Sequence, residues 1–238
     1  MQEESTNTNP LSSDAAEFFD LLTNDIVLLR SQWRIYKAFF GANKERHDLL
    51  FSVSNVTART LERTLFEATL LGLRRLTDHP ESGRRKRQTV SIKGLPKLFE
   101  GDDRVQIQSL IGAALHTSKF ARNWSDKKIA HSDLNFRSGE LGLELASRAK
   151  VDDAIEAIAK VIKWVAAEKQ GVTLITHPTT LANDEIRFLE CIYDGMLVGE
   201  EKERQYRMYN KSGRYQERDR LYDYPPWLKR SEQIFDID

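Results

Sequence analysis

The chain has 238 residues, of which 40% are hydrophobic and 30% are charged. That composition is typical of one soluble domain of about 200 residues with appendages. Lysine and arginine number 36, and so do aspartate and glutamate, so the formal net charge is zero. This balance excludes a polycation that grips nucleic acid by bulk charge, and any nucleic-acid site must be a local patch.

The cellular compartment is suggested by the one cysteine and by the absence of long apolar runs. Cys191 excludes an internal disulfide, fits a reducing cytoplasm, and is expected to be a small buried hydrophobe. No apolar run reaches the ~18–20 residues of a membrane span. The N-terminus is acidic and polar, unlike a signal peptide. We therefore expect a cytoplasmic protein without membrane association.

The first half of the chain predicts two long helices. Asp14 is a good N-cap for an amphipathic helix of about seven turns that ends at Gly41. A second apolar stripe predicts a helix over residues 44–77, which ends before Pro80 because proline disfavours a preceding helical residue. Residues 79–90 are expected to form a loop with a basic run.

The next predicted elements are shorter. A short helix is expected around residues 91–99, and Asp102 or Asp103 can cap a helix whose apolar positions continue to Ile129. Alternation within residues 134–145 favours a small hairpin or an extended linker.

A strong amphipathic pattern at residues 151–169, closed by Gly171, predicts another helix, and one more is expected over residues 183–197. Together these elements predict an all-α, up-and-down helical bundle of four to five main helices. We expect a disordered tail at 1–13, the bundle at 14–171, and a C-terminal helix and extension at 172–238.

The C-terminal extension is rich in tyrosine and arginine. Residues 201–230 hold nine lysines and arginines against five acids, with six aromatic residues between them. Such side chains could stack on nucleic-acid bases, but tyrosines at half-wet surfaces more often pack against their own domain or a dimer partner.

Common cofactor and metal motifs are missing. The sequence has no GxxxxGK[ST] or GxGxxG loop, no cysteine pair and no HExxH, so no cofactor or metal is expected. His79 and His177 precede prolines and are expected in loops without a chemical role, and His116 is expected to be a satisfied helix residue.

The most informative stretch is residues 122–133, which reads RNWSDKKIAHSD. A histidine can move a proton near neutral pH, and nearby cations can hold a phosphate, so the stretch is suited to RNA cleavage without a metal. The plainer interpretation is a solvated helix end, in which His131 and Asp133 bond to local backbone groups.

Two segments resemble one known family. Residues 126–133 resemble the NKxIAHxD ending of the motif of HEPN domains in their AbiU-like (abortive-infection U-type) branch. The stretch LRRLTDHP at residues 73–80 resembles the end of a long helix in that branch. The resemblance covers roughly residues 15–170. It implies a helical homodimer that cleaves RNA without metal across a shared cleft, in phage defence or a toxin–antitoxin pair.

The resemblance also implies roles for individual residues. His131 would be the general acid/base, and Arg122, Asn123 and Asp126 would complete the catalytic group. RNA would be held by Lys127 and Lys128. Independently of the resemblance, the basic run Arg84, Arg85, Lys86 and Arg87 is either a solvated loop or a phosphate contact, because clustered cations release counterions when they bind RNA.

The sequence departs from the family pattern at one position, because Ser125 stands where the motif arginine is expected. On an ideal helix, at ~100° per residue, Arg122 would point away from His131, whereas Asn123, Lys127 and His131 would share a face. Either a lysine supplies the missing charge, or the helix loosens and Arg122 turns in. The alternative function is a helical dimer that binds RNA or a partner protein, such as an antitoxin, without cleavage.

Overall fold

A computed structural model describes residues 11–82, 87–131, 133–177 and 184–228. Its contacts divide the chain into two compact units, Met1–Glu185 and Ile186–Asp238. The first unit contains α1 (Ser13–Tyr36), a π-helical turn (Lys37–Gly41), α2 (Lys44–Val53), α3 (Asn55–Leu76), β1 (Glu81–Ser82), β2 (Arg87–Gln88), a 3-10 helix (Ile92–Leu98), α4 (Gly101–Thr117), α5 (Lys119–Trp124), a second π-helical turn (Ser125–Ile129), α6 (Leu134–Arg137) and α7 (Arg148–Gln170).

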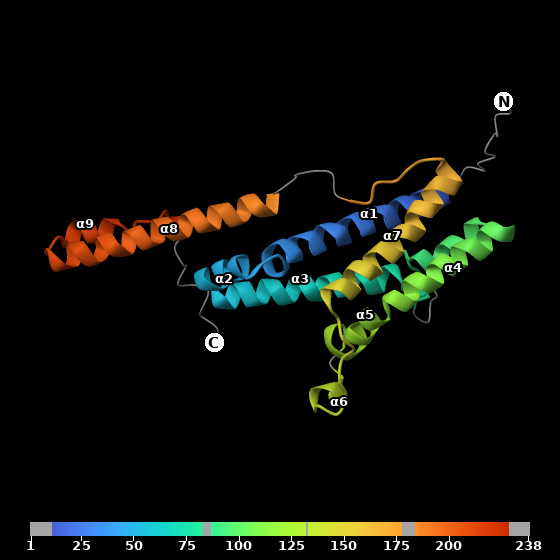
Figure 1. The fold of residues 1–238 in the computed structure, drawn as a ribbon, viewed down its shortest axis with the longest axis horizontal. Helices are drawn as coiled ribbons and strands as arrows, with labels where there is room; N and C mark the ends of the chain where they lie inside the picture. Colours follow the sequence, from blue (N-terminus) through green and yellow to red (C-terminus); the bar gives the residue numbers. More distant parts are fainter. Residues whose placement is uncertain (1–10, 83–86, 132, 178–183, 229–238) are drawn as a thin grey trace. The chain divides into compact units, whose positions relative to one another are not determined.

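The predicted all-α class is confirmed. In the first unit α1 packs along α3, α4 packs along α7, and α1 also contacts α7, so the four long helices share one core (Figure 1). Within the described residues, the sheet is limited to the antiparallel pair β1–β2, which interrupts the loop predicted over 79–90. No helix of the described residues is both long and apolar enough to cross a membrane.

The core follows from the spacing of apolar residues in the sequence. The buried side chains of α7 recur every three or four positions, as the 151–169 pattern predicted: Val151, Ala154, Ile155, Ile158, Ile162 and Val165. Each fully buried Leu, Ile or Val contributes about 1.5–3 kcal/mol relative to an exposed one. Gly171 closes α7 with a φ of 66°, a conformation that glycine adopts without a steric penalty.

Two predicted helix starts are wrong by two or three residues. The side chain of Ser12, not that of Asp14, caps α1 by accepting a hydrogen bond from the amide of Ala15 at 3.4 Å. Residue 100 occupies the N-cap position of α4, so Asp102 and Asp103 lie in its first turn instead. Acidic side chains there interact favourably with the positive end of the helix dipole.

The two predicted N-terminal helices are each interrupted. The α-helical part of the first ends at Tyr36, and a π-helical turn carries the chain to Gly41. The helix predicted over residues 44–77 is two helices, because Ser54 is extended (φ −158°, ψ 100°) and its hydroxyl donates to Thr57 Oγ1 at 2.9 Å. Serine side chains that bond locally compete with the helix.

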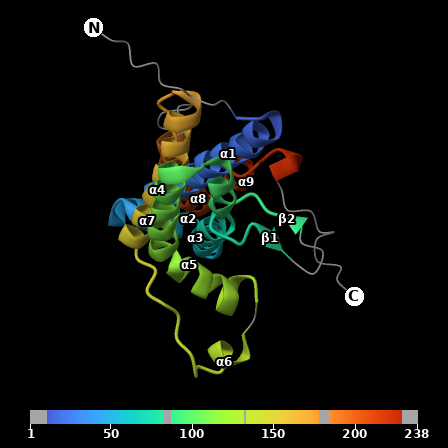
Figure 2. The same cartoon turned by 90° about the vertical axis from the view of Figure 1, so that its right-hand side faces the viewer.

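The helix predicted to run to Ile129 is also divided. It breaks at Ser118, whose hydroxyl donates to the carbonyl of Ala114 at 2.6 Å, and α5 then widens into the second π-helical turn. Residues 134–137 form α6 rather than a hairpin or extended linker, because Asp133 caps them by accepting from the amide of Phe136 at 2.9 Å. Residues 142–147 then return to α7 without helix or strand (Figure 2).

The second unit is formed mainly by α8 (Asp184–Lys211), α9 (Tyr215–Arg220) and a 3-10 turn (Pro226–Leu228). The predicted end of α8 at Leu197 is wrong: strong helix formers carry the helix on to Lys211, while Asn183 lies outside the described residues. The guanidinium of Arg218 lies over the rings of Tyr206 and Tyr215, at 5.6 and 5.0 Å. The tyrosines and arginines therefore pack within their own unit.

Cys191 lies on α8 and is exposed, so the expectation that it is buried is wrong. Its apolar sequence neighbours do not share its environment: Leu189 is 5% exposed, whereas Phe188 is 48% exposed. The apolar run around Cys191 therefore does not mark a buried face on its side of the helix.

Candidate functional site

The end of α3 meets α5 and the second π-helical turn. Arg74, on α3, donates one hydrogen bond to Ser125 Oγ at 2.9 Å and another to the carboxylate of Asp126. Ser125 is fully buried, and the side chain of Arg74 is 21% exposed. A guanidinium from a different helix therefore lies against the position where the sequence pattern led us to expect an arginine.

Arg122 binds the same end of α3. Its Nη2 atom donates to Asp78 Oδ1 and to the carbonyl of Thr77, both at 3.3 Å. Asp78 Oδ2 also lies 4.0 Å from Arg74 Nε, so one carboxylate links the two guanidinium groups. We call Arg74, Asp78, Arg122 and Asp126 the arginine–aspartate cluster; its two positive and two negative charges balance.

Asn123 and Lys127 point the other way, toward the segment that returns to α7. Asn123 Oδ1 accepts from the amide of Glu144 at 3.0 Å, and the indole of Trp124 donates to the carbonyl of Glu144 at 2.7 Å. Lys127 Nζ donates to the carbonyl of Gly142 at 3.0 Å. Asn123 and Lys127 thus share a face, as predicted, but that face holds the protein's own backbone.

Lys128 is paired within the fold. Its Nζ atom lies 3.3 Å from Glu67 Oε1 and 4.9 Å from the centre of the Trp124 ring, which packs edge-on against Phe66. A lysine with a carboxylate and an aromatic partner is held in place. Its structural role is to fasten the π-helical turn to α3.

His131 lies beyond the end of the second π-helical turn and is exposed. The prediction that it shares a helical face with Asn123 and Lys127 is wrong, because the helix ends at Ile129. One of the two alternatives was that the helix loosens and Arg122 turns in. The helix does loosen, because the amide of Ala130 bonds to the carbonyl of Ser125 at 2.9 Å, five residues back, but the hydrogen bonds of Arg122 go to Thr77 and Asp78. Within the described residues the imidazole has no hydrogen bond or ion pair, so it is open to a ligand.

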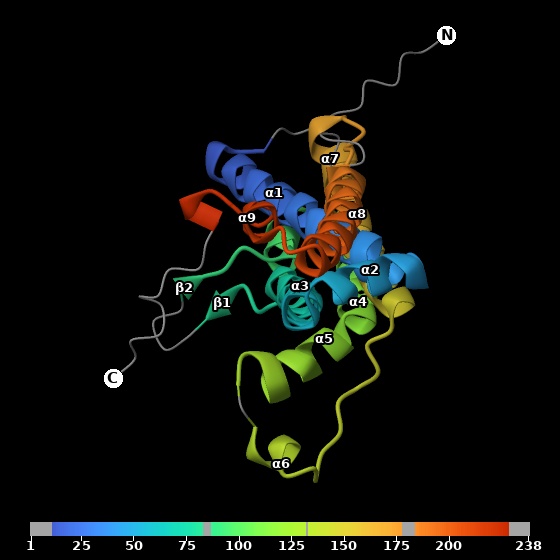
Figure 3. The same cartoon turned by 90° about the vertical axis from the view of Figure 1, so that its left-hand side faces the viewer.

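The basic loop is described only in part. Arg84, Arg85 and Lys86 lie outside the described residues, while Arg87 is exposed on β2. Strands β1 and β2 lie beside α3 (Figure 3). The hairpin is tied to the end of α3 because the amide of Thr89 donates to the carbonyl of Pro80 at 2.9 Å. Nearby, the ring of His79 bonds to the backbone of Glu81, a local contact.

Sequence reasoning assigned no role to Arg74, Thr77, Asp78 or Ser125. The signal was available for the first three, since they lie in the LRRLTDHP stretch that supported the family resemblance. The site therefore joins both matching segments in space. Among the described residues, no group of three or more His, Cys, Asp or Glu side chains is arranged to hold a metal ion.

A comparison with protein families identifies the family of this chain. A family model for HEPN domains, described as AbiU2, matches residues 12–185, well over half of the chain. The class of the protein is therefore that of HEPN domains. Within that class, the chain belongs to the AbiU2 family. Comparisons with curated proteins and with solved structures gave no significant match.

Proposed function

We propose that this protein cleaves RNA without a metal ion, acting in the cytoplasm in phage defence or as the toxin of a toxin–antitoxin pair. His131 transfers the proton, and Arg74 holds the phosphate. The observation that carries the proposal is the contact of Arg74 with Ser125, which brings a guanidinium to the position where the motif lacks one. The setting in defence rests on membership of the family.

The chemistry uses groups that RNA itself carries. The ribose 2′-oxygen attacks the neighbouring phosphorus while His131 accepts the hydroxyl proton, and the bond to the 5′-oxygen breaks as that oxygen takes a proton from water. The products are a 2′,3′-cyclic phosphate and a 5′-hydroxyl. The positive charge of Arg74 stabilises the charge that builds on the phosphate oxygens in the transition state. DNA lacks the 2′-hydroxyl and is not a substrate.

A phosphate can reach Arg74 by replacing Asp126. The side chain of Asp126 is 49% exposed, so it can turn into water when a phosphate oxygen takes its place. This exchange substitutes one anion for another, and the arginine–aspartate cluster keeps its charge balance. Phosphate also matches the planar guanidinium with two parallel hydrogen bonds.

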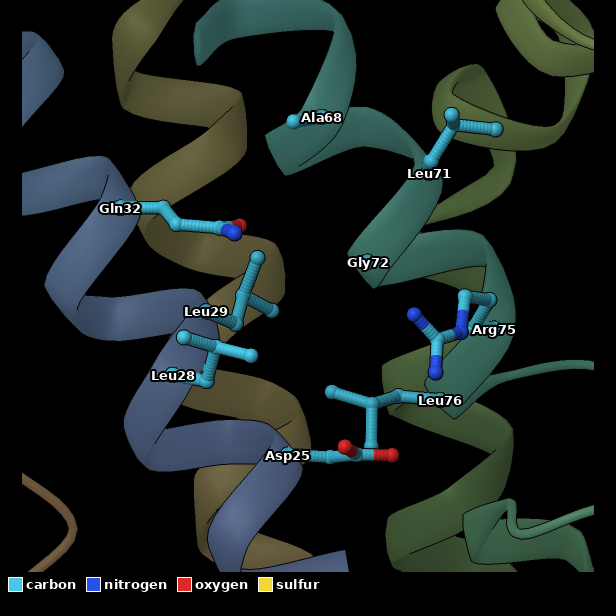
Figure 4. Close-up of a pocket in the computed structure, with 9 residues that line it drawn as sticks. All are labelled: Asp25, Leu28, Leu29, Gln32, Ala68, Leu71, Gly72, Arg75 and Leu76. Carbon is cyan, nitrogen blue, oxygen red and sulfur yellow. The ribbon is translucent and has the colours of Figure 1, made fainter.

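We also propose that the protein is a homodimer and that the groove between α1 and α3 is the interface. The groove has a volume of about 250 Å³ and is mainly apolar, and Leu28 on its rim is 55% exposed (Figure 4). Asp25 lies on its α1 wall and Arg75 on its α3 wall, and neither has an ion-pair partner among the described residues. A two-fold axis would pair Asp25 of one copy with Arg75 of the other.

A second function is favoured by the pairing of the cations. Arg74 is paired with Asp126, Arg122 with Asp78, and Lys128 with Glu67. If these pairs persist, the protein would bind RNA or a partner such as an antitoxin without cutting.

One experiment separates the two functions. Purified protein is incubated with total RNA in EDTA, beside His131→Ala and a control, His116→Ala, which changes an exposed histidine of α4. Cleavage that is lost in His131→Ala and kept in His116→Ala supports the enzyme. Intact RNA that is retained at low salt supports binding without cleavage, and no retention contradicts both RNA functions.

A further inference from the structure

Two cations of α1 and a third in the π-helical turn that follows it line a cavity whose walls do not include His131. Arg30, Arg34 and Lys37 follow one another at intervals of four and three residues and face α7 across a cavity of about 160 Å³. The other residues that line it are Trp33, Asp152, Ile155, Glu156 and His177.

Each cation has one carboxylate partner. Arg30 Nη1 lies 2.8 Å from Glu156, Lys37 Nζ lies 2.8 Å from Asp152, and Arg34 Nη2 lies 3.3 Å from Glu185, which is not part of the cavity wall. The charges are therefore balanced. The hydrogen-bond donors are not, because a guanidinium has five N–H groups and each pair here uses one nitrogen.

Of the three cations, Arg30 has the most hydrogen-bond donors without an acceptor among the described residues. Its side chain is only 6% exposed. The Nη1 atom forms the ion pair with Glu156 and also hydrogen-bonds with the ring nitrogens of His177, which lie at 3.0 and 3.3 Å. The two nitrogens Nε and Nη2 are buried and have no acceptor among the described residues, and the same is true of Arg34 Nε. Nε and Nη2 form the edge of a guanidinium that binds two oxygens of one anion side by side. Buried donors without acceptors are costly, so a ligand with more acceptor oxygens than one carboxylate would stabilise Arg30.

We propose that this cavity binds a phosphate group, free or carried by a small molecule, at Arg30, where the phosphate replaces Glu156 on Nη1. A cavity needs only ~10–15 Å³ of space for one water, so a phosphate with bound water fits. A tetrahedral oxyanion has further oxygens for Arg34 and Lys37, which a planar carboxylate lacks.

Glu156 is the side chain that the phosphate displaces. It is 58% exposed, so it can turn into water and let the phosphate take its place on Arg30 Nη1, which exchanges one anion for another. Asp152 stays, because it also accepts a hydrogen bond from the indole of Trp33 at 2.7 Å. Glu156 thus competes with the ligand, and this competition gives the proposal two predictions of opposite sign.

The test titrates inorganic phosphate, and separately a 5′-mononucleotide, into the full-length protein at constant ionic strength, with binding followed by calorimetry. Arg30→Gln should weaken binding about ten- to a hundredfold, the loss of charged hydrogen bonds. Glu156→Gln should strengthen it, and Lys160→Gln, on the exposed face of α7, should leave it unchanged. If the nucleotide binds more tightly than inorganic phosphate, the site also contacts the nucleoside part of the ligand.

The proposal is overturned if the wild-type protein binds neither probe, if Arg30→Gln binds as the wild type does, or if Glu156→Gln binds more weakly. If Arg30→Gln does not fold, as judged by circular dichroism, the sign of the Glu156→Gln effect decides. The His131→Ala variant should bind phosphate at this cavity as the wild type does. The test of the phosphate site is therefore independent of the test of RNA cleavage.

Discussion

The guanidinium of Arg74 donates a hydrogen bond of 2.9 Å to the hydroxyl of Ser125, 51 residues further along the chain. The first residue lies on α3 and the second begins the second π-helical turn. The cation of the candidate site thus comes from a different helix than the histidine segment. A site assembled in this way depends on the packing of α3 against α5.

Arg74 should matter more for cleavage than for folding. Replacing it with methionine should lower the RNA cleavage rate about 10²- to 10³-fold, the usual effect of removing one group that stabilises transition-state charge. Arg74→Lys should recover part of the rate, because lysine keeps the charge but not the planar fork. Single-turnover rates check this. Ser125→Ala is the control, since it removes the same contact but keeps the cation; equal rate losses in both variants would contradict a role in catalysis.

The indole of Trp124 should hold the segment that returns to α7. Trp124→Phe keeps an aromatic ring against Phe66 but loses the 2.7 Å hydrogen bond to Glu144, so the protein should lose about 1 kcal/mol of stability. Amide hydrogen exchange at residues 142–146 should become faster. Trp227→Phe, which changes a side chain that is 81% exposed, should alter neither quantity.

Two glycine substitutions should have opposite effects. Gly171 has a φ of 66°, so Gly171→Ala should destabilise the protein by about 1 kcal/mol. Gly112 lies inside α4, where an added Cβ would meet no atom within 4 Å. Gly112→Ala should therefore stabilise by about 0.5–1 kcal/mol. Urea unfolding measures both changes, and two shifts of the same sign would contradict the backbone argument.

A charge in the α1–α3 groove should separate the proposed dimer. Leu28→Glu places a carboxylate on the exposed rim, where burying it against a second copy would be costly. Light scattering should show a dimer for the wild type and a monomer for the variant. Val105→Glu, at a position of α4 that is 66% exposed, should remain dimeric. A dimeric Leu28→Glu variant would place the interface elsewhere.

His177 should make the protein less stable in mild acid. Burial, and then the charge of Arg30, lowers the pKa of His177 below 6.5. The folded state therefore binds fewer protons than the unfolded state, and the stability from the neutral ring is present above about pH 6.5 and declines as the pH falls below it. His177→Gln should flatten the fall in Tm between about pH 7 and pH 5.5. An unchanged slope would show that another group titrates.

Apolar spacing was sufficient to predict the class of fold and a helix over residues 151–169, which the structure extends to Arg148–Gln170, because a buried stripe of three- and four-residue intervals is typical of a helix. It missed the breaks at Ser54 and Ser118. Both are caused by hydroxyl groups that bond locally, and the apolar stripe continues on the other side of each break. Periodicity alone does not register a short interruption of this kind.

The site was predicted less completely than the fold. The sequence pointed to the segment around His131, and to the stretch that contains Arg74, but not to their contact. Arg74 and Ser125 are 51 residues apart, and the spacing of neighbouring residues does not predict a contact over that separation. The roles of Asn123 and Lys127 were missed for a similar reason, since their acceptor and donor groups belong to the backbone of residues 142–144, which carries no side-chain signal.

The wide turn at Ser125–Ile129 also bears on how this segment tolerates changes in length. Its carbonyl-to-amide bond spans five residues instead of four, so the turn holds one residue more than an ordinary α-helical turn. Loss of a single residue here would tighten the turn to α-helical geometry and leave the direction of the following chain nearly the same. Homologues one residue shorter at this point can therefore present the histidine in the same place.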